Sequence, residues 1–141
     1  MTQEQTEQYE AVGDVLPTVL RAAAVRLSDN RWTQRAFARD AHNDPTQHLA
    51  DEACKWCLTG ALAVECYRAY PNAPSQTAHY DALRSLCDGQ LRAVLQLRGS
   101  DDQALPHWND HPHRTASEVR AALYEAATSW ERGRLEVQVG K

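Results

Sequence analysis

The sequence predicts an all-α fold: a single compact domain of about four helices, with an irregular segment after the first helix and a long loop before the last. The chain has 141 residues, of which 43% are hydrophobic, and this suits one domain with its own core. Four stretches carry apolar residues at the three-to-four-residue spacing of a helix. We expect residues 1–13 to be frayed, residues 14–131 to form the helical domain, and residues 132–141 to be a C-terminal tail without an assigned structure.

The first helix is predicted from Asp14 to about Asp29. Its apolar positions follow the helical period: Leu16, Val19, Leu20, Ala23 and Leu27. Asp14 can cap this helix, and Pro17 is tolerated in a first turn. The acidic and glutamine-rich residues before it contain too few apolar side chains to pack.

Residues 30–48 fit neither the helical nor the strand period. An Asn-Asp-Pro turn signal lies within them, so we expect a short irregular or extended passage, with a hairpin ending at that turn as one form of it. If the segment were helical, Arg31, Arg35 and Arg39 would share one face. These arginines, with Asp40 as an internal counter-charge, are candidates to bind an anion or an acidic partner. An ordinary solvated face is the alternative.

The central helix is predicted from about Leu49 to Tyr70, ended by the proline that follows. Gly60 lies inside it. A glycine in a helix interior costs about 1 kcal/mol, and we explain it by the close approach of a neighbouring backbone, expected to be another helix. This boundary places Cys54 inside a helix and Cys57 roughly two turns from its start.

The third helix is expected to begin with Ser75 as its cap and to end near Gly99. The Asp88-Gly89 pair is an optional break into two pieces. The last helix is predicted from Thr115 to about Glu131, because Thr115 and Glu118 fit a capping box.

The loop before the last helix concentrates polar side chains. Asn109 and Asp110 can accept hydrogen bonds from nearby backbone amides and Pro112 fixes φ, so an Asx-type turn anchored by a buried Trp108 is expected. Arg114 is expected to pair with Asp110 or with a carboxylate elsewhere. This interpretation is structural. The functional alternative is that the loop presents Asp110 to a ligand or partner.

Two kinds of chemistry are alternatives for the cysteines and histidines. A metal site would combine Cys54 and Cys57 with His107 and His111, but a single CxxC inside a helix is a poor zinc knuckle. A thiol nucleophile would use Cys57 with a loop histidine, His111, as base and Asp110 or Asn109 to orient it, but nucleophilic cysteines usually lie at a helix N-terminus. We therefore expect buried, reduced cysteines and no metal, cofactor or catalytic residue.

The charge and hydropathy of the sequence argue against two classes of partner, nucleic acids and membranes. The chain has 15 basic and 19 acidic residues, a net charge of −4, and this balance does not favour nucleic acid. No stretch approaches the roughly 18 apolar residues of a membrane span and no signal sequence is recognisable, so we expect no membrane segment and a cytoplasmic location.

Three motifs carry a resemblance to a known family. WTQRAFARDA (32–41), WCLTGAL (56–62) and WNDHPHRTASEV (108–119) resemble, in order and spacing, an uncharacterised domain of unknown function from small proteins of high-GC bacteria and their phages. The resemblance implies that these residues occupy the family's motif positions: Trp32, Ala38, Arg39, Asp40, Trp56, Cys57, Gly60, Ala61, Leu62, Asn109, Asp110 and Thr115. The chain departs from the pattern at 42–44 and at His113, where glycine is usual.

From these observations we expect a small bacterial or phage accessory or regulatory protein, acting by binding a protein partner or by self-association. An enzyme that uses Cys57 or Asp110 is one alternative. Small-molecule capture in a pocket framed by Trp32, Trp56 and Trp108 is another. The candidate binding residues are Trp32, Arg35, Arg39, Asp40, Trp108, Asn109, Asp110 and Arg114.

Overall fold

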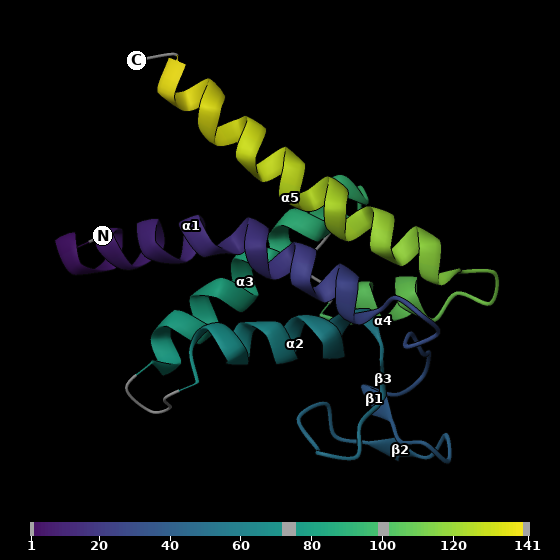
Figure 1. Ribbon diagram of the computed structural model, residues 1–141. Coiled ribbons are helices and arrows are strands. Elements are labelled where there is room, and N and C mark those ends of the chain that lie inside the picture. Colours follow the sequence, from purple (N-terminus) through teal and green to yellow (C-terminus); the bar gives the residue numbers. More distant parts are fainter. Residues whose placement is uncertain (1, 72–75, 99–101, 140–141) are drawn as a thin grey trace.

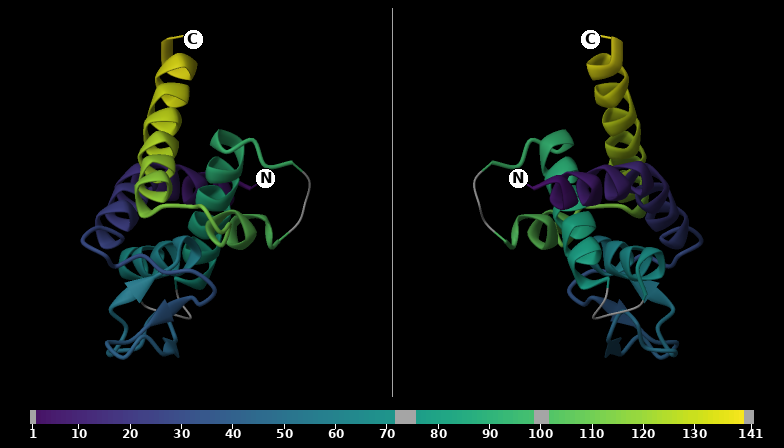
Figure 2. Two further views of the ribbon diagram at one scale, coloured as in Figure 1. Left: turned by 90° about the vertical axis from the view of Figure 1, so that its right-hand side faces the viewer. Right: turned by 90° about the vertical axis from the view of Figure 1, so that its left-hand side faces the viewer.

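The computed structural model describes residues 2–71, 76–98 and 102–139. The described chain is mostly helical, which confirms the predicted class, and it adds a small sheet in the irregular segment (Figure 1). In chain order, the elements are α1 (Gln3–Arg26), β1 (Ala38–Arg39), β2 (Pro45–Thr46), β3 (Lys55–Trp56), α2 (Leu58–Ala69), α3 (Thr77–Val94), α4 (Ala104–Asn109) and α5 (Ala116–Val139). The sheet lies at one end of the molecule, and the C-terminal part of α5 projects from the opposite end (Figure 2).

Helix α1 lies at the centre of the helical layer. It packs against α5 on one side and against α2 and α3 on the other (Figure 1). Apolar residues at helical spacing give each helix one buried face, so the four long helices share one core. Its largest fully buried side chains include Leu16, Leu20, Leu62, Leu83, Leu91 and Leu123. None of the helices in the described ranges is long and apolar enough to cross a membrane.

Helix α1 begins at Gln3, before the predicted start at Asp14, and so includes most of the residues that were expected to be frayed. Thr2 and Gln5 form a capping box, with the Gln5 amide donating to Thr2 Oγ1 at 3.1 Å. Pro17 therefore lies inside the helix, where it cannot donate to the carbonyl four residues before it. That carbonyl, of Gly13, instead accepts a hydrogen bond from Trp130 Nε1 at 2.9 Å. A contact from α5 thus compensates for the proline.

Helix α5 continues through the residues expected to be an unassigned tail and ends at Val139. Arg134 on this extension forms an ion pair with Asp14 at 2.7 Å. The predicted start of the helix is confirmed, since the Glu118 amide donates to Thr115 Oγ1 and the Thr115 amide donates to Glu118 Oε1.

Helix α2 begins at Leu58, not near Leu49, and its N-cap is Cys57. The residues before it form turns and strand β3. Helix α3 shows no break at Asp88-Gly89 and ends at Val94, before the predicted end near Gly99. The proposed cap Ser75 lies outside the described residues, and the short helix α4 within the long loop was not predicted.

Residues 30–48 are mainly irregular and contain the short strands β1 and β2, joined by a turn, which agrees with the predicted irregular passage and hairpin. Strand β1 is central and pairs antiparallel with β2 and β3, with Ala38 opposite Thr46 on one side and Trp56 on the other. Asp40 Oδ1 accepts hydrogen bonds from the amides of His42 and Asp44, which closes the turn between β1 and β2. Because this segment is not helical, the arginine stripe expected along a helix face does not form.

Candidate functional site

The WTQRAFARDA segment, the β3–α2 junction and α4 meet around the side chain of Asn109, which is 1% exposed. Asn109 Oδ1 accepts hydrogen bonds from Trp32 Nε1 at 2.7 Å and from the Leu58 amide at 3.1 Å. Its Nδ2 donates to the Thr33 carbonyl at 3.2 Å and to Asp110 Oδ1 at 3.0 Å. Both donors of the amide and both lone pairs of its oxygen are therefore used to join three segments.

Asp110 fixes the backbone of the facing segment. Its Oδ1 accepts a hydrogen bond from the Arg35 amide at 2.8 Å, and Arg35 has a φ of 64°. A left-handed conformation is unfavourable for a residue with a long side chain, so it needs such support. Gln34 Nε2 adds two hydrogen bonds, to the carbonyls of Asn109 at 2.9 Å and His111 at 2.8 Å.

The three arginines singled out in the sequence have different roles. Arg31 donates to the carbonyls of Ser28 and Val25. Arg39 spans its own segment by donating to Thr33 Oγ1 and to the carbonyls of Asn43 and Gln34. The guanidinium of Arg35 makes no hydrogen bond or ion pair within the part of the chain that the structure describes. It is therefore the one arginine of the three whose charge is available to a partner.

Arg114 closes the other side of the loop. Its guanidinium stacks on Trp108, 3.9 Å from the ring centroid, and its Nε donates to the Trp108 carbonyl at 2.9 Å. The predicted ion pair forms with Glu118 at 3.2 Å and not with Asp110. Trp108 is half-buried rather than buried. Both residues hold the loop against the start of α5.

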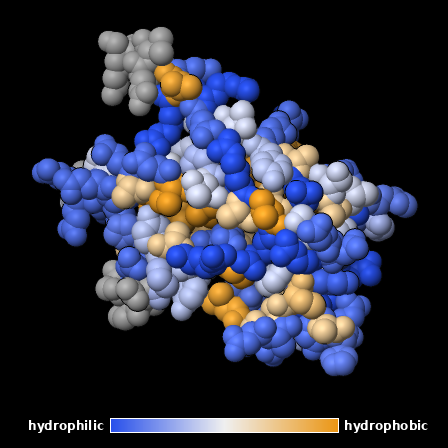
Figure 3. Space-filling model, in the orientation of Figure 1, coloured by the Kyte–Doolittle hydropathy of each residue, from blue (hydrophilic) through white to orange (hydrophobic). Residues whose placement is uncertain are grey.

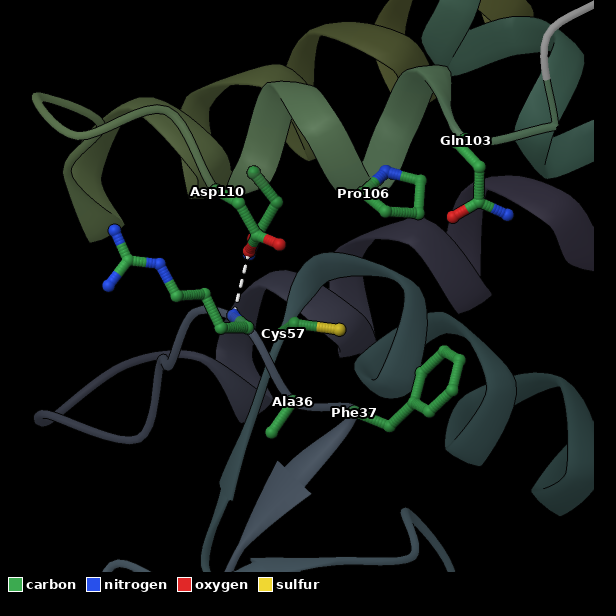
Figure 4. A pocket seen from close by; sticks show the side chains of 8 residues that line it. Ala36, Phe37, Cys57, Gln103, Pro106 and Asp110 are labelled. Atoms are coloured by element: carbon green, nitrogen blue, oxygen red, sulfur yellow. Dashed lines mark hydrogen bonds between the residues drawn. The ribbon is translucent and has the colours of Figure 1, made fainter.

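A cavity of about 270 Å³ opens beside this network, between residues 35–37 and α4 (Figure 4). Phe37 forms part of its wall and is 57% exposed. The Phe37 carbonyl accepts a hydrogen bond from the Cys57 amide at 3.1 Å. A Cβ added to Gly60 would lie 2.2 Å from the same carbonyl oxygen, which confirms the predicted close approach at Gly60, although the neighbour is a loop and not a helix. The lining residues are Arg35, Ala36, Phe37, Cys57, Gln103, Pro106, Asn109 and Asp110.

Cys57 lies at the N-cap of α2, so the predicted position inside a helix is wrong. Its Sγ points into the cavity and accepts a hydrogen bond from the Gly60 amide at 3.3 Å (Figure 4). Burial raises the pKa of this thiol, the amides of Gly60 and Thr59 oppose that shift, and the charge of Asp110 adds to it. The thiol is therefore protonated at neutral pH and is a poor nucleophile, despite its place at a helix terminus.

The alternative catalytic set is not assembled. Among the residues with described positions, the amides that approach the Cys57 sulfur belong to its own helix, Gly60 and Thr59. His111 Nδ1 accepts a hydrogen bond from the His113 amide at 3.2 Å, and its ring packs near the ring of His113. Within the described residues, neither His111 nor Asp110 is therefore hydrogen-bonded to the thiol.

The alternative metal ligands are also not brought together. The described part of the chain contains no group of three or more histidine, cysteine or acidic side chains that could hold a metal ion. Cys54 lies just before β3, where its amide donates to the Arg39 carbonyl at 2.9 Å. The Cys54, Cys57, His107 and His111 set thus lacks the shared centre that a tetrahedral site needs.

The three tryptophans do not frame the cavity. Trp32 forms a bridge with Trp56 and donates its indole hydrogen to Asn109. Trp56 Nε1 donates to the His48 carbonyl, and its ring lies under Arg26. Sequence reasoning missed Phe37, Gln103 and Pro106 as cavity residues. A signal was present only for Phe37, the single phenylalanine of the chain, in a polar motif.

Comparisons with known proteins place the chain in a family but give no function. The model described as "Family of unknown function (DUF6197)" matches residues 12–129. No curated protein and no solved structure matches the chain. Residues 12–129 contain the three motifs and every residue of the site described above.

Proposed function

The chain belongs to the DUF6197 family, whose function is unknown, and we propose that this member is a non-catalytic protein that acts by binding a protein partner. The binding face consists of residues 35–37 and α4, with the cavity between them. One observation carries the proposal: the side chain of Phe37 is 57% exposed beside an apolar cavity, while its backbone is fixed to the N-terminus of α2. Aromatic residues, phenylalanine included, are enriched at protein–protein interfaces relative to the rest of the surface.

The polar residues of the motifs support binding rather than catalysis. Asn109, Arg39 and Arg114 direct their side chains to backbone carbonyls, neighbouring side chains and a tryptophan ring. The nearby thiol of Cys57 has a raised pKa and, among the described residues, no hydrogen bond to a histidine or a carboxylate. These groups therefore stabilise the shape of the face, and binding depends on the side chains exposed on it.

On the face drawn in Figure 3, the surface favours a partner of a different kind over an extensive contact with a second copy of the chain. In the view of Figure 3 the apolar surface is divided into separate patches by hydrophilic side chains. Obligate homodimers usually bury a larger and more continuous apolar area. The chain also resembles proteins of bacteria and phages. We therefore propose an accessory or regulatory role in the cytoplasm of the bacterial cell or the infected host.

Site-specific photo-crosslinking tests the proposal. A benzophenone amino acid replaces Phe37 in one variant and Tyr124, an exposed residue of α5, in a control variant. Both variants are produced in the native host and irradiated. We expect a discrete heavier species from position 37 and not from position 124. No crosslink at position 37, equal crosslinks at both positions, or a product of twice the chain's own mass would contradict partner binding at this face.

A further inference from the structure

We propose that the cavity receives one bulky apolar side chain from an extended segment of the partner, and that a carboxylate of the same segment pairs with Arg35. This inference rests on the proposed function, because it names the chemistry of the segment that the face binds. It uses four features of the site: the size of the cavity, the paired amides at its floor, the charges on its rim, and the rigidity of its walls.

The size of the cavity favours a side chain over a small molecule. Its volume of about 270 Å³ lies near the lower end of the roughly 300–1,000 Å³ typical of small-molecule pockets, so it has room for one large side chain. Phe37, Ala36 and Pro106 give it an apolar lining, with Phe37 and Pro106 on opposite sides of the opening (Figure 4). A leucine, phenylalanine or tryptophan side chain fits such a space and would cover the exposed ring of Phe37.

The helix terminus at the floor of the cavity does not favour an anion. The amides of Cys57, Leu58 and Gly60, which would bind an anion at the start of α2, already donate to protein acceptors. Their acceptors are the carbonyl of Phe37, the side chain of Asn109 and the sulfur of Cys57. These three amides are therefore satisfied internally, and an apolar group can fill the cavity without leaving any of them unpaired.

The charged side chains at the rim of the cavity favour particular residues next to the apolar side chain of the bound segment. Arg35 is exposed and its guanidinium has no partner in the described ranges, so a carboxylate of the bound segment can form a charge-assisted hydrogen bond with it. Asp110 uses one oxygen, Oδ1, for the two hydrogen bonds it accepts. Its second oxygen can accept a backbone amide of the segment, which an extended peptide offers.

The walls of the cavity are held in place before a partner arrives. Asp110 holds the amide of Arg35 in its left-handed conformation, and Cys57 holds the carbonyl of Phe37. Gly60 allows the closest approach of that carbonyl to α2. Binding to such a face loses little conformational entropy on this side of the interface.

Selection from a random library identifies the preferred peptide. The full chain is used to select from an mRNA-displayed library of dodecapeptides, and the most enriched sequence is synthesised with a fluorophore. We expect a consensus with one large apolar residue and an aspartate or glutamate within about two positions of it. Binding is then measured by fluorescence anisotropy with the wild-type chain, Arg35→Glu, Phe37→Ala, and the control Arg132→Glu, which reverses an exposed charge on α5.

We expect Arg35→Glu to weaken binding by roughly tenfold and Arg132→Glu to leave it within about twofold. Replacing the acidic residue of the peptide with lysine should restore binding to Arg35→Glu. Unchanged thermal unfolding of Arg35→Glu shows that the variant is folded, and it is expected because the Arg35 guanidinium makes no hydrogen bond or ion pair within the described ranges. Enrichment of no peptide, or equal binding by Arg35→Glu and Arg132→Glu, would overturn the inference. If the peptide experiment fails but a partner is still crosslinked at position 37, then the proposed function is supported and only this inference about the bound segment is overturned.

Discussion

Replacing Gly60 with alanine tests the close contact that fixes the binding face. The new Cβ would lie 2.2 Å from the Phe37 carbonyl oxygen and 3.1 Å from its carbon. Both atoms belong to backbone, so no side-chain rotation relieves the clash, and the loop must move by roughly 1 Å to reach an ordinary separation. That movement also weakens the 3.1 Å hydrogen bond from the Cys57 amide to the same oxygen.

Three contributions set the magnitude for Gly60→Ala. Overpacking costs about 1–3 kcal/mol, and a buried amide that loses its acceptor costs a similar amount. Alanine is favoured over glycine in a helix by at most about 1 kcal/mol. The net expectation is a loss of about 2–4 kcal/mol in the free energy of unfolding.

Gly89 provides a matched control, because it lies inside α3 and a Cβ added there meets nothing within 4 Å. Gly89→Ala should therefore raise the free energy of unfolding by about 0.5–1 kcal/mol. Urea unfolding followed by circular dichroism measures both variants. If Gly60→Ala is as stable as the wild-type chain, or gains stability as Gly89→Ala does, then the loop does not press on α2 as described.

Three other predictions concern the buried groups. Cys57 should react with iodoacetamide more slowly than Cys54 in the folded chain at neutral pH, and equally fast after unfolding. Because the pKa of the Cys57 thiol is raised above the ordinary 9.0 in the folded chain, its contribution to the free energy of unfolding should be lost as the pH rises above about 9. Unfolding measured as a function of pH tests this. Asn109→Asp should cost about 3 kcal/mol in urea unfolding, since a carboxylate would face the oxygens that now accept from Nδ2; wild-type stability would contradict the network. Glu65→Gln should lower stability by about 3 kcal/mol by leaving the half-buried Arg26 without its ion-pair partner, and a melting temperature equal to that of the wild-type chain would show the pair to be unimportant.

The helical class could be predicted from the sequence because it depends on local patterns. Apolar spacing identified the four long helices, and the Thr115–Glu118 capping box identified the start of α5 correctly. The boundaries failed where distant residues decide them. Helix α2 begins at Leu58 because the residues before it pair with β1 and because the Leu58 amide donates to Asn109, 51 residues away. No local signal predicts such an acceptor.

The site was predictable in part for the same reason. Asn109 and Asp110 were expected to stabilise backbone, and they do, but their partners lie on the segment 32–35 and at the start of α2 rather than two residues on. The arginine stripe depended on a helix that does not form. Phe37 gave no periodic signal, because its exposure follows from a backbone carbonyl fixed by Cys57 and not from an amphipathic pattern.

The order of the Asn-Asp pair explains how a rigid face can be built from two small side chains. The first position must both donate and accept, since it faces two carbonyl or carboxylate oxygens and two N–H groups, and a side-chain amide has both functions. The second position accepts only, from the Arg35 amide and from Asn109 Nδ2, and an ionised carboxylate accepts more strongly than an amide oxygen. Exchange of the two residues would place the carboxylate where a donor is needed and the amide where charge strengthens acceptance. The order Asn109-Asp110 therefore suits the left-handed conformation of Arg35 better than the reverse order. The position of the Arg35 guanidinium beside the cavity depends on that conformation.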